Sequence, residues 1–245
     1  MYDNSAFHIH TFRCKHAENV SDEEYVKKTI ELGYSDIWFT DHVPFPGDPF
    51  GHRMDCAQLP EYIDTLKKLR EKYPAIGIHI GLETEYLPSF DKCGYYEELK
   101  ENKDIELLLL GQHMAEISDD PIIYSFEQDR QMRCQNEFIQ LGNAIVQGID
   151  SGYFDAVAHP DRIFRHCSKW TDEMNDMAKR IICGADRRNI SLEINISSME
   201  YGMYYRKEFW ALVPESVNKV IGFDAHSVEQ FEKRSEFLLK CSRKS

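Results

Sequence analysis

The stretch AFHIH, residues 6–10, alternates apolar side chains with two histidines. Side chains two residues apart point to the same face of a β-strand but to different faces of a helix. His8 and His10 can therefore bind one ion together only if this stretch is a strand. The stretch VIGFDAH, residues 220–226, offers an aspartate and a histidine two residues apart in the same way. Both stretches predict strands that carry metal ligands.

Further short apolar runs lie between these two stretches. Each run is followed by a polar connection and an amphipathic segment with helical period, and capping boxes mark helix starts at 21–24 and 227–230. Strands that alternate with helices predict a parallel sheet, and seven such units without a Gly-rich phosphate loop favour a closed barrel over a doubly wound sheet. We therefore predict a single-domain α/β barrel over residues 1–245. Its strands are expected near residues 6–10, 35–41, 76–83, 106–112, 154–159, 190–195 and 219–225.

Candidate metal ligands follow the carboxyl ends of these runs. In a parallel barrel those ends converge on one face, which is where active sites are built. Residues far apart in the sequence are thereby expected to meet in one multinuclear metal site. They are His8, His10, His42, Glu83, His113, His159, Asp224 and His226, with His16 close behind the first pair.

The composition limits the classes of function. The 42 acidic and 29 basic residues give a formal net charge of -13, which argues against nucleic acid or an anionic membrane as a partner. No stretch approaches the roughly 18 apolar residues of a membrane span, and the first residues do not form a signal peptide, so we expect a cytoplasmic protein. The seven cysteines include no C-x-x-C pair, which favours reduced thiols over a disulfide framework or a zinc knuckle.

Six motifs, in one order along the chain, resemble those of the polymerase and histidinol phosphatase (PHP) superfamily, and within it the histidinol-phosphate phosphatases. The resemblance implies a distorted (β/α)7 barrel, in agreement with the seven units inferred from periodicity. The motifs are HIHTFRCKHA (8–17), FTDHVPF (39–45), GLETEYLP (81–88), GQH (111–113), AHPD (158–161) and GFDAH (222–226).

The resemblance implies three divalent transition-metal ions, which the ligand types allow to be zinc, manganese or iron. The first ion would be held by His8, His10, Glu83 and Asp224. The second would be held by Glu83, His113 and His159, and the third by His16, His42 and His226. Glu85 has the same strand parity as Glu83, so spacing alone leaves both open, and the motif GLE favours Glu83 as the bridging ligand.

Three further residues are expected to act beside the metals. Asp161 is expected to orient an imidazole or a proton-transfer group, as is Asp41. The resemblance implies that Arg165 contacts the phosphate, although the segment AHPDRIFR also offers Arg162.

Such a site suits hydrolysis of a phosphomonoester by a metal-bridging hydroxide, because divalent ions activate water and neutralise phosphoryl charge. The expected substrate is a small phosphorylated molecule, with histidinol phosphate of histidine biosynthesis first. Phosphotyrosine, sugar phosphates and short oligonucleotides remain alternatives, because EINISSME (193–200) lacks the basic residue that often follows EINT in histidinol phosphatases. A non-catalytic module would be expected to lack ligands, and an amidohydrolase-like barrel would be expected to carry a lysine on a ligand-bearing strand.

Overall fold

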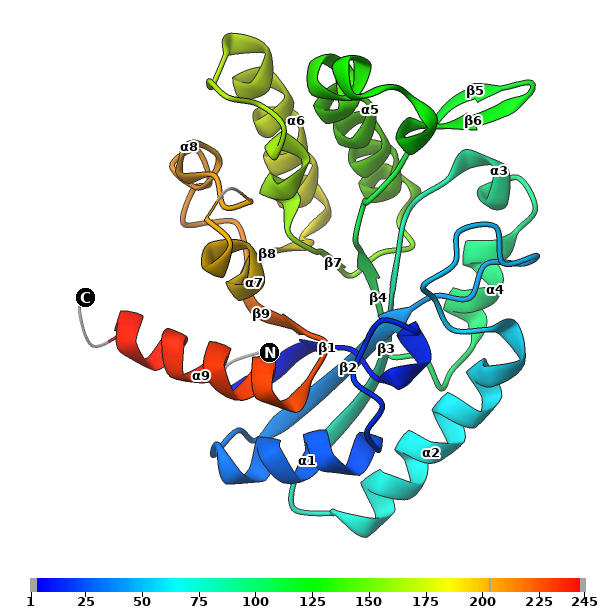
Figure 1. The fold of residues 1–245 in the computed structure, drawn as a ribbon, viewed down its shortest axis with the longest axis vertical. Helices are drawn as coiled ribbons and strands as arrows, with labels where there is room; N and C mark the ends of the chain where they lie inside the picture. The colour runs from blue at the N-terminus through cyan, green and yellow to red at the C-terminus, as the bar shows by residue number, and fades with distance from the viewer. Residues whose placement is uncertain (1–3, 203, 243–245) are drawn as a thin grey trace.

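Seven parallel strands close into a barrel in the computed structural model, which describes residues 4–202 and 204–242 (Figure 1). The first and last strands pair with each other, so the sheet has no open edge. In barrel order the strands are β1 (Ser5–Ile9), β2 (Asp36–His42), β3 (Gly77–Thr84), β4 (Leu107–Leu110), β7 (Ala156–Val157), β8 (Ser191–Asn195) and β9 (Lys219–Ala225).

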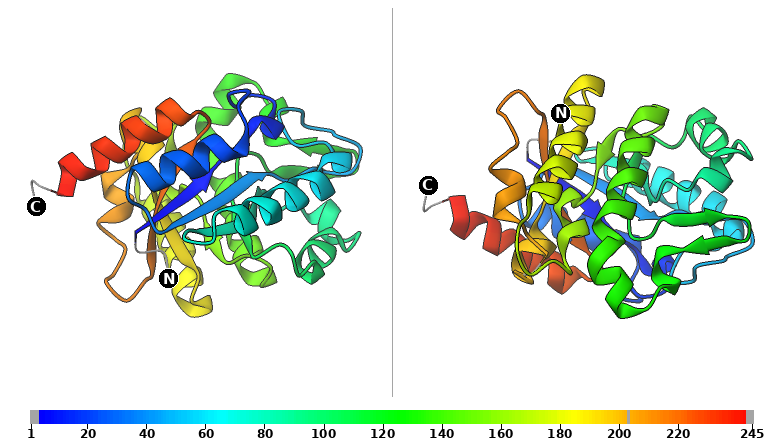
Figure 2. Two further views of the ribbon diagram at one scale, coloured as in Figure 1. Left: turned by 90° about the horizontal axis from the view of Figure 1, so that it is seen from below. Right: turned by 90° about the horizontal axis from the view of Figure 1, so that it is seen from above.

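Each of the seven predicted runs overlaps one of these strands, so the expected (β/α)7 barrel is confirmed and the doubly wound alternative is wrong. The helices lie around the outside of the barrel (Figure 2). They are α1 (Asp22–Glu31), α2 (Leu59–Lys72), α3 (Pro88–Asp91), α4 (Tyr95–Glu101), α5 (Arg130–Ser151), α6 (Asp172–Arg188), α7 (Ile196–Glu200), α8 (Lys207–Trp210) and α9 (Val228–Ser242). No helix within residues 4–202 and 204–242 is both long and apolar enough to cross a membrane.

The core has two parts because the strands alternate their side chains. One face of each strand packs against the helices in a large apolar cluster, as Ile37 and Phe39 do on β2. The other face fills the barrel interior with a smaller cluster. Its members are Phe7, Trp38, Leu107, Leu109, Ala156, Ala158 and Val220. Toward the carboxyl ends of the strands, polar side chains replace this apolar cluster.

Two features depart from the regular pattern. A short antiparallel hairpin, β5 (Glu116–Asp119) and β6 (Ile122–Tyr124), projects after β4 and was not predicted (Figure 1). In addition, the pairing register of β1 shifts against both neighbouring strands. At these shifts His8 has φ 67° and Asp224 has φ 50°, a left-handed conformation that non-glycine residues seldom adopt.

Candidate metal centre

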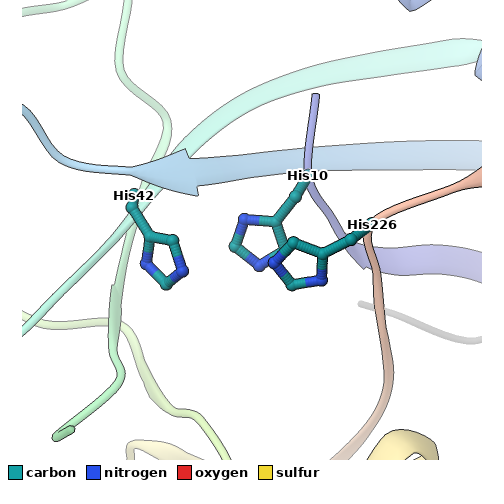
Figure 3. Close-up of side chains that lie close together, drawn as sticks. All are labelled: His10, His42 and His226. Atoms are coloured by element: carbon teal, nitrogen blue, oxygen red, sulfur yellow. The ribbon is translucent and has the colours of Figure 1, made fainter. Parts of the chain in front are cut away.

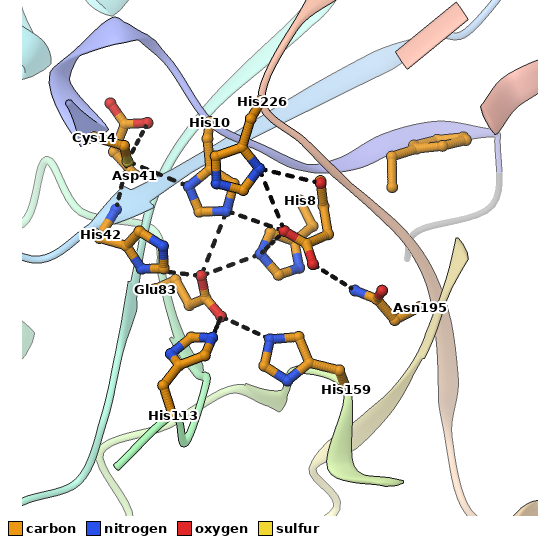
Figure 4. Close-up of polar contacts among 12 residues, drawn as sticks. His8, His10, Cys14, Asp41, His42, Glu83, His113, His159, Asn195 and His226 are labelled. Carbon is orange, nitrogen blue, oxygen red and sulfur yellow. Dashed lines mark hydrogen bonds and ion pairs between the residues drawn. The ribbon is translucent and has the colours of Figure 1, made fainter. Parts of the chain in front are cut away.

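The carboxylate of Glu83, near the end of β3, lies among five imidazoles (Figure 4). Its Oε2 is 3.3 Å from His8 Nε2, 3.4 Å from His10 Nε2 and 3.2 Å from His42 Nδ1. Its Oε1 is 3.1 Å from His159 Nε2 and 3.7 Å from His113 Nε2. Both oxygens therefore face imidazole nitrogens. A carboxylate that bridges two metal ions needs this position, because the other ligands of each ion lie near its oxygens.

The remaining expected ligands extend the cluster on the β9 side. Asp224 Oδ1 lies 3.9 Å from His8 Nε2 and 3.7 Å from His10 Nε2. The His226 ring stacks on His10 at a centroid distance of 4.1 Å, and Figure 3 shows these two rings and His42 gathered around one space. The His16 ring lies 4.4 Å from His226 and 5.5 Å from His42. The structure thus brings all nine expected ligands together.

The cluster fits metal ions by its unsatisfied atoms. Four of its buried imidazole nitrogens have no hydrogen-bond partner within the described part of the chain, which is costly unless something else binds them. These atoms are His8 Nε2, His10 Nε2, His42 Nδ1 and His226 Nε2. Among the described residues, four sets place one possible ligand atom each within 4.8 Å of one another: His8, His10 and Glu83; His42, Glu83 and His113; His10, His42 and His226; and His10, Cys14 and Asp41.

The protonation states of the histidines also fit metal binding. Burial lowers the pKa of His10 and His42, and lowers that of His159 and His226 to about 4, so these imidazoles are neutral at pH 7, as metal binding requires. His8 differs, because the nearby carboxylates of Glu193, Glu83 and Asp224 outweigh the effect of burial and raise its pKa. The buried carboxylates therefore attract positive charge to the centre of the cluster.

Residues behind the ligands fix their orientation. Glu193 of β8, which sequence reasoning did not single out, places Oε1 2.6 Å from His8 Nδ1, and its Oε2 accepts from the backbone N–H of His159 at 2.8 Å. Glu85 Oε1 lies 2.9 Å from His113 Nδ1 and accepts from Arg53 Nη2 at 2.6 Å. Such contacts hold a metal-binding imidazole in one tautomer and one orientation. Glu83, near the end of β3, thus faces the other candidate ligand atoms, and Glu85, just after β3, supports one ring.

Two residues expected beside the metals point elsewhere. Asp161 accepts from the backbone N–H of Arg206 at 2.8 Å and from Trp210 Nε1 at 3.0 Å, and burial raises its pKa to about 7. Arg165 donates to Glu137 of α5 at 2.9 Å. Neither residue lines the pocket above the ligands.

The pocket above the ligands has a volume of about 460 Å³. Its floor includes His42, His113 and Asp224, and its walls come from loops that follow different strands. Arg162, the alternative to Arg165 in the AHPDRIFR segment, lines this pocket and donates to Asp224 Oδ2 at 3.2 Å. Arg53 and Tyr201 also line it, so cationic and aromatic groups surround the ligand cluster.

A seven-stranded parallel barrel with buried imidazoles and carboxylates at the carboxyl ends of its strands defines a class of metal-dependent barrel proteins. Comparison with known families matches residues 6–197 to the PHP domain, and the chain belongs to that family.

Individual relatives carry related descriptions. A protein of Deinococcus radiodurans described as a probable histidinol-phosphatase is 29% identical over 161 residues, which span 63% of this chain but only 59% of that protein. The crystal structure of the putative histidinol phosphatase hisK from Listeria monocytogenes has a TM-score of 0.76 at 20% identity, with 92% of this chain and 96% of that chain covered. The histidinol phosphate phosphatase of Lactococcus lactis, complexed with zinc, L-histidinol and phosphate, has a TM-score of 0.71 at 19% identity, with 96% and 92% covered.

Proposed function

We propose that the chain is a metal-dependent phosphomonoesterase that hydrolyses histidinol phosphate with three divalent ions of zinc, manganese or iron. The observation that carries this proposal is the position of Glu83, whose two carboxylate oxygens face five imidazoles. Two of these imidazoles, those of His42 and His113, line a pocket that arginine also lines. A cytoplasmic location stays a prediction of the sequence, as does the assignment of residues 1–245 to one domain.

The charge of the site suits a phosphate dianion. With three divalent ions, seven neutral imidazoles and two carboxylates, the charges of +6 and -2 sum to about +4. Bound divalent ions would lower the pKa of water from about 15.7 to about 7 and neutralise charge on the phosphoryl oxygens. The protein's part is to hold the ligands in place, and Arg162 adds a cation in contact with the pocket.

The substrate assignment is supported by the relatives. The Deinococcus protein is described as a probable histidinol-phosphatase, and the Lactococcus enzyme was crystallised with L-histidinol and phosphate. Neither relative determines which leaving group fits this chain, because EINISSME (193–200) differs from the histidinol phosphatase pattern and Ser197 lines the pocket.

A hydrolysis panel tests both the reaction class and the substrate of the proposal. The metal-loaded protein, prepared with manganese and with zinc, is assayed on histidinol phosphate, phosphotyrosine, glycerol phosphate, sugar phosphates and short oligonucleotides. We expect kcat/KM for histidinol phosphate to exceed that for generic esters by about a hundredfold, roughly 2.7 kcal/mol of transition-state discrimination. A flat profile would contradict the histidinol phosphate assignment alone, and no hydrolysis of any ester would contradict the phosphomonoesterase.

A further inference from the structure

Arg53 lies in the loop after β2 and is an unusual arginine, because it is buried and yet lines the pocket. Only 6% of its surface is exposed. Its guanidinium carbon lies 5.4 Å from the ring centre of Phe45 and 5.6 Å from that of Phe50, so two aromatic faces hold the group in place. Nη2 donates to Glu85 Oε1 at 2.6 Å. The orientation of the guanidinium is therefore fixed before any ligand binds.

The other nitrogens of Arg53 have no such partner. Nε and Nη1 are buried without a hydrogen-bond acceptor among residues 4–202 and 204–242. Buried donors of a charged group that remain unpaired are costly, so they are expected where a ligand supplies the acceptor. The acceptor has to come from the pocket that Arg53 lines, and its chemistry has to be anionic oxygen.

Arg162 makes the same kinds of contact on the Asp224 side of the cluster. It donates through Nη2 to a carboxylate of the site, Asp224, and its guanidinium carbon lies 5.3 Å from the ring centre of Tyr204. Its buried Nε also has no partner within the described part of the chain. One arginine is thus anchored beside His113 through Glu85, and the other beside Asp224, with the metal ligands between them.

The other arginines near the site are already engaged. Arg234 lines the pocket but donates to the backbone carbonyls of Phe223 and Asp224 and to Glu200. Arg165 is bound to Glu137, away from the pocket. Arg53 and Arg162 are therefore the two pocket arginines whose Nε is left for a ligand.

We propose that Arg53 binds the phosphoryl group of the substrate, as one arm of a clamp whose second arm is Arg162. This inference rests on the proposed phosphomonoesterase function and adds a residue from the loop after β2, outside the six motifs. Because both arms contact the phosphoryl group, the clamp acts on every phosphomonoester alike and leaves the choice of leaving group to other residues.

The test measures binding of inorganic phosphate to the metal-loaded full chain by calorimetry, together with competitive inhibition by phosphate. Arg53→Lys keeps a positive charge beside Glu85 but removes the Nε donor, and Arg53→Gln removes the charge as well. Both variants should weaken phosphate binding about tenfold to a hundredfold, the range expected for hydrogen bonds to charged groups. Metal content, measured by mass spectrometry, should stay at the wild-type level in Arg53→Lys. The variant Arg180→Gln, which loses contacts to Asn143 of α5 and to Met177 of α6 outside the pocket, is the matched control and should bind phosphate as the wild type does.

The outcomes separate the clamp from the proposed function. The clamp is supported if kcat/KM falls by a common factor for all phosphomonoesters in Arg53→Lys. It is overturned if Arg53→Lys binds phosphate like the wild type, or if Arg165→Gln weakens phosphate binding and Arg53→Lys does not. If the metal-loaded wild type neither binds phosphate nor hydrolyses any ester, the proposed function itself fails.

Discussion

At the scale of single residues, the glutamates at the end of β3 and just after it show how a two-residue step separates two tasks. Glu83 presents both oxygens to imidazole nitrogens, whereas Glu85 places one oxygen between His113 and Arg53. Both carboxylates are buried, so burial alone does not distinguish them. The difference lies in which atoms they face.

Glu83→Gln should therefore lose more bound metal and more activity than Glu85→Gln. Replacing the carboxylate by a neutral amide removes one negative charge from between the two groups of imidazoles. We therefore expect loss of bound metal and a fall in kcat of more than about a hundredfold. Glu85→Gln should retain its metal and lose about tenfold at most. Elemental analysis and steady-state kinetics of both variants check this, and an equal loss in the two variants would show that the wrong glutamate was assigned to the centre.

Glu193→Gln is expected to weaken metal binding about tenfold to a hundredfold, although Glu193 is not a ligand in our assignment. Its carboxylate holds His8 of β1 and the backbone of His159 after β7, so one change disturbs ligands from two strands. Metal titration of the apoprotein measures the effect. Asn195→Ala, which removes a neighbouring contact to the same carboxylate, should cost less; metal affinity unchanged in Glu193→Gln would contradict the assigned role.

The sequence predicted the ligands better than their supporting residues. Histidines and carboxylates at strand ends form a recognisable pattern, because strand ends converge in a parallel barrel. Glu193 has the same strand-end position in EIN, and this was the one available indication of its role. Spacing could not show that Arg162 lines the pocket and Arg165 does not, because this difference depends on the contact of Arg165 with Glu137 of α5.

At the scale of elements, the centre depends on two kinds of position: those where the strand pairing is irregular, and those where a glycine leaves room for a carboxylate. The left-handed residues His8 and Asp224 lie at the register shifts around β1, and strain of this kind is common at functional sites. Gly111, just after β4, lies directly against the Glu83 carboxylate, and a methyl group there would overlap Oε1. Gly222 of β9 has the same relation to Glu193 Oε1.

Gly111→Ala should therefore disrupt the centre without touching a ligand. The added methyl group forces Glu83 to move, so we expect metal content and activity to fall at least about tenfold. Gly184→Ala is the matched control, because its nearest neighbour would be Ile149 Cγ2 at 3.3 Å and the residue lies in helix α6. The free energy of unfolding in the control should change by about 1 kcal/mol or less. Full metal content in Gly111→Ala would show that Glu83 tolerates the displacement.

The elements themselves were largely predictable, and their irregularities were not. Apolar runs marked all seven barrel strands because each strand is buried on both faces. No sequence rule identifies a left-handed histidine at position 8, since non-glycine residues adopt that conformation only when tertiary contacts enforce it. The β5–β6 hairpin was missed because its residues, around DDP (119–121), lack a strong alternating pattern.

At the scale of the whole molecule, every strand of the barrel contributes to the centre. Six strands lead to the nine proposed ligands, and β8 contributes Glu193. Metal binding therefore joins all seven strands at one end of the barrel. A protein with this arrangement gains stability from its ions, because only the folded chain assembles the full ligand set.

Removal of the metals should accordingly lower the melting temperature. At free metal a hundred times the dissociation constant, each ion adds about 2.7 kcal/mol to the free energy of unfolding. Differential scanning calorimetry with and without chelator measures the shift. The Glu83→Gln variant should show a smaller shift than the wild type, and a chelator effect of equal size in both proteins would mean that the ions bind elsewhere.

The metal-free protein should also lose stability as the pH falls from about 6.5 toward about 4. Burial lowers the pKa of His10 and His42, and lowers that of His159 and His226 to about 4, so the unfolded chain takes up protons in this range that the folded chain does not. His8 and Asp161 oppose the trend, because their raised pKa values let the folded chain bind protons in this range. Melting temperatures of the metal-free protein between pH 7 and pH 4 test this, and a rise toward pH 4 would contradict it.

The stacking of His10 on His226 across the β1–β9 pairing joins nearly the first and nearly the last residues of the described chain. During synthesis on a ribosome, β1 is made first and cannot pair with β9 until the other barrel strands have been made as well. A growing chain that still lacks β9 presents the early histidines without Asp224 and His226. We therefore expect full loading with metal to wait for β9, and a truncated product that lacks β9 would be left both open at one edge of its sheet and deficient in metal.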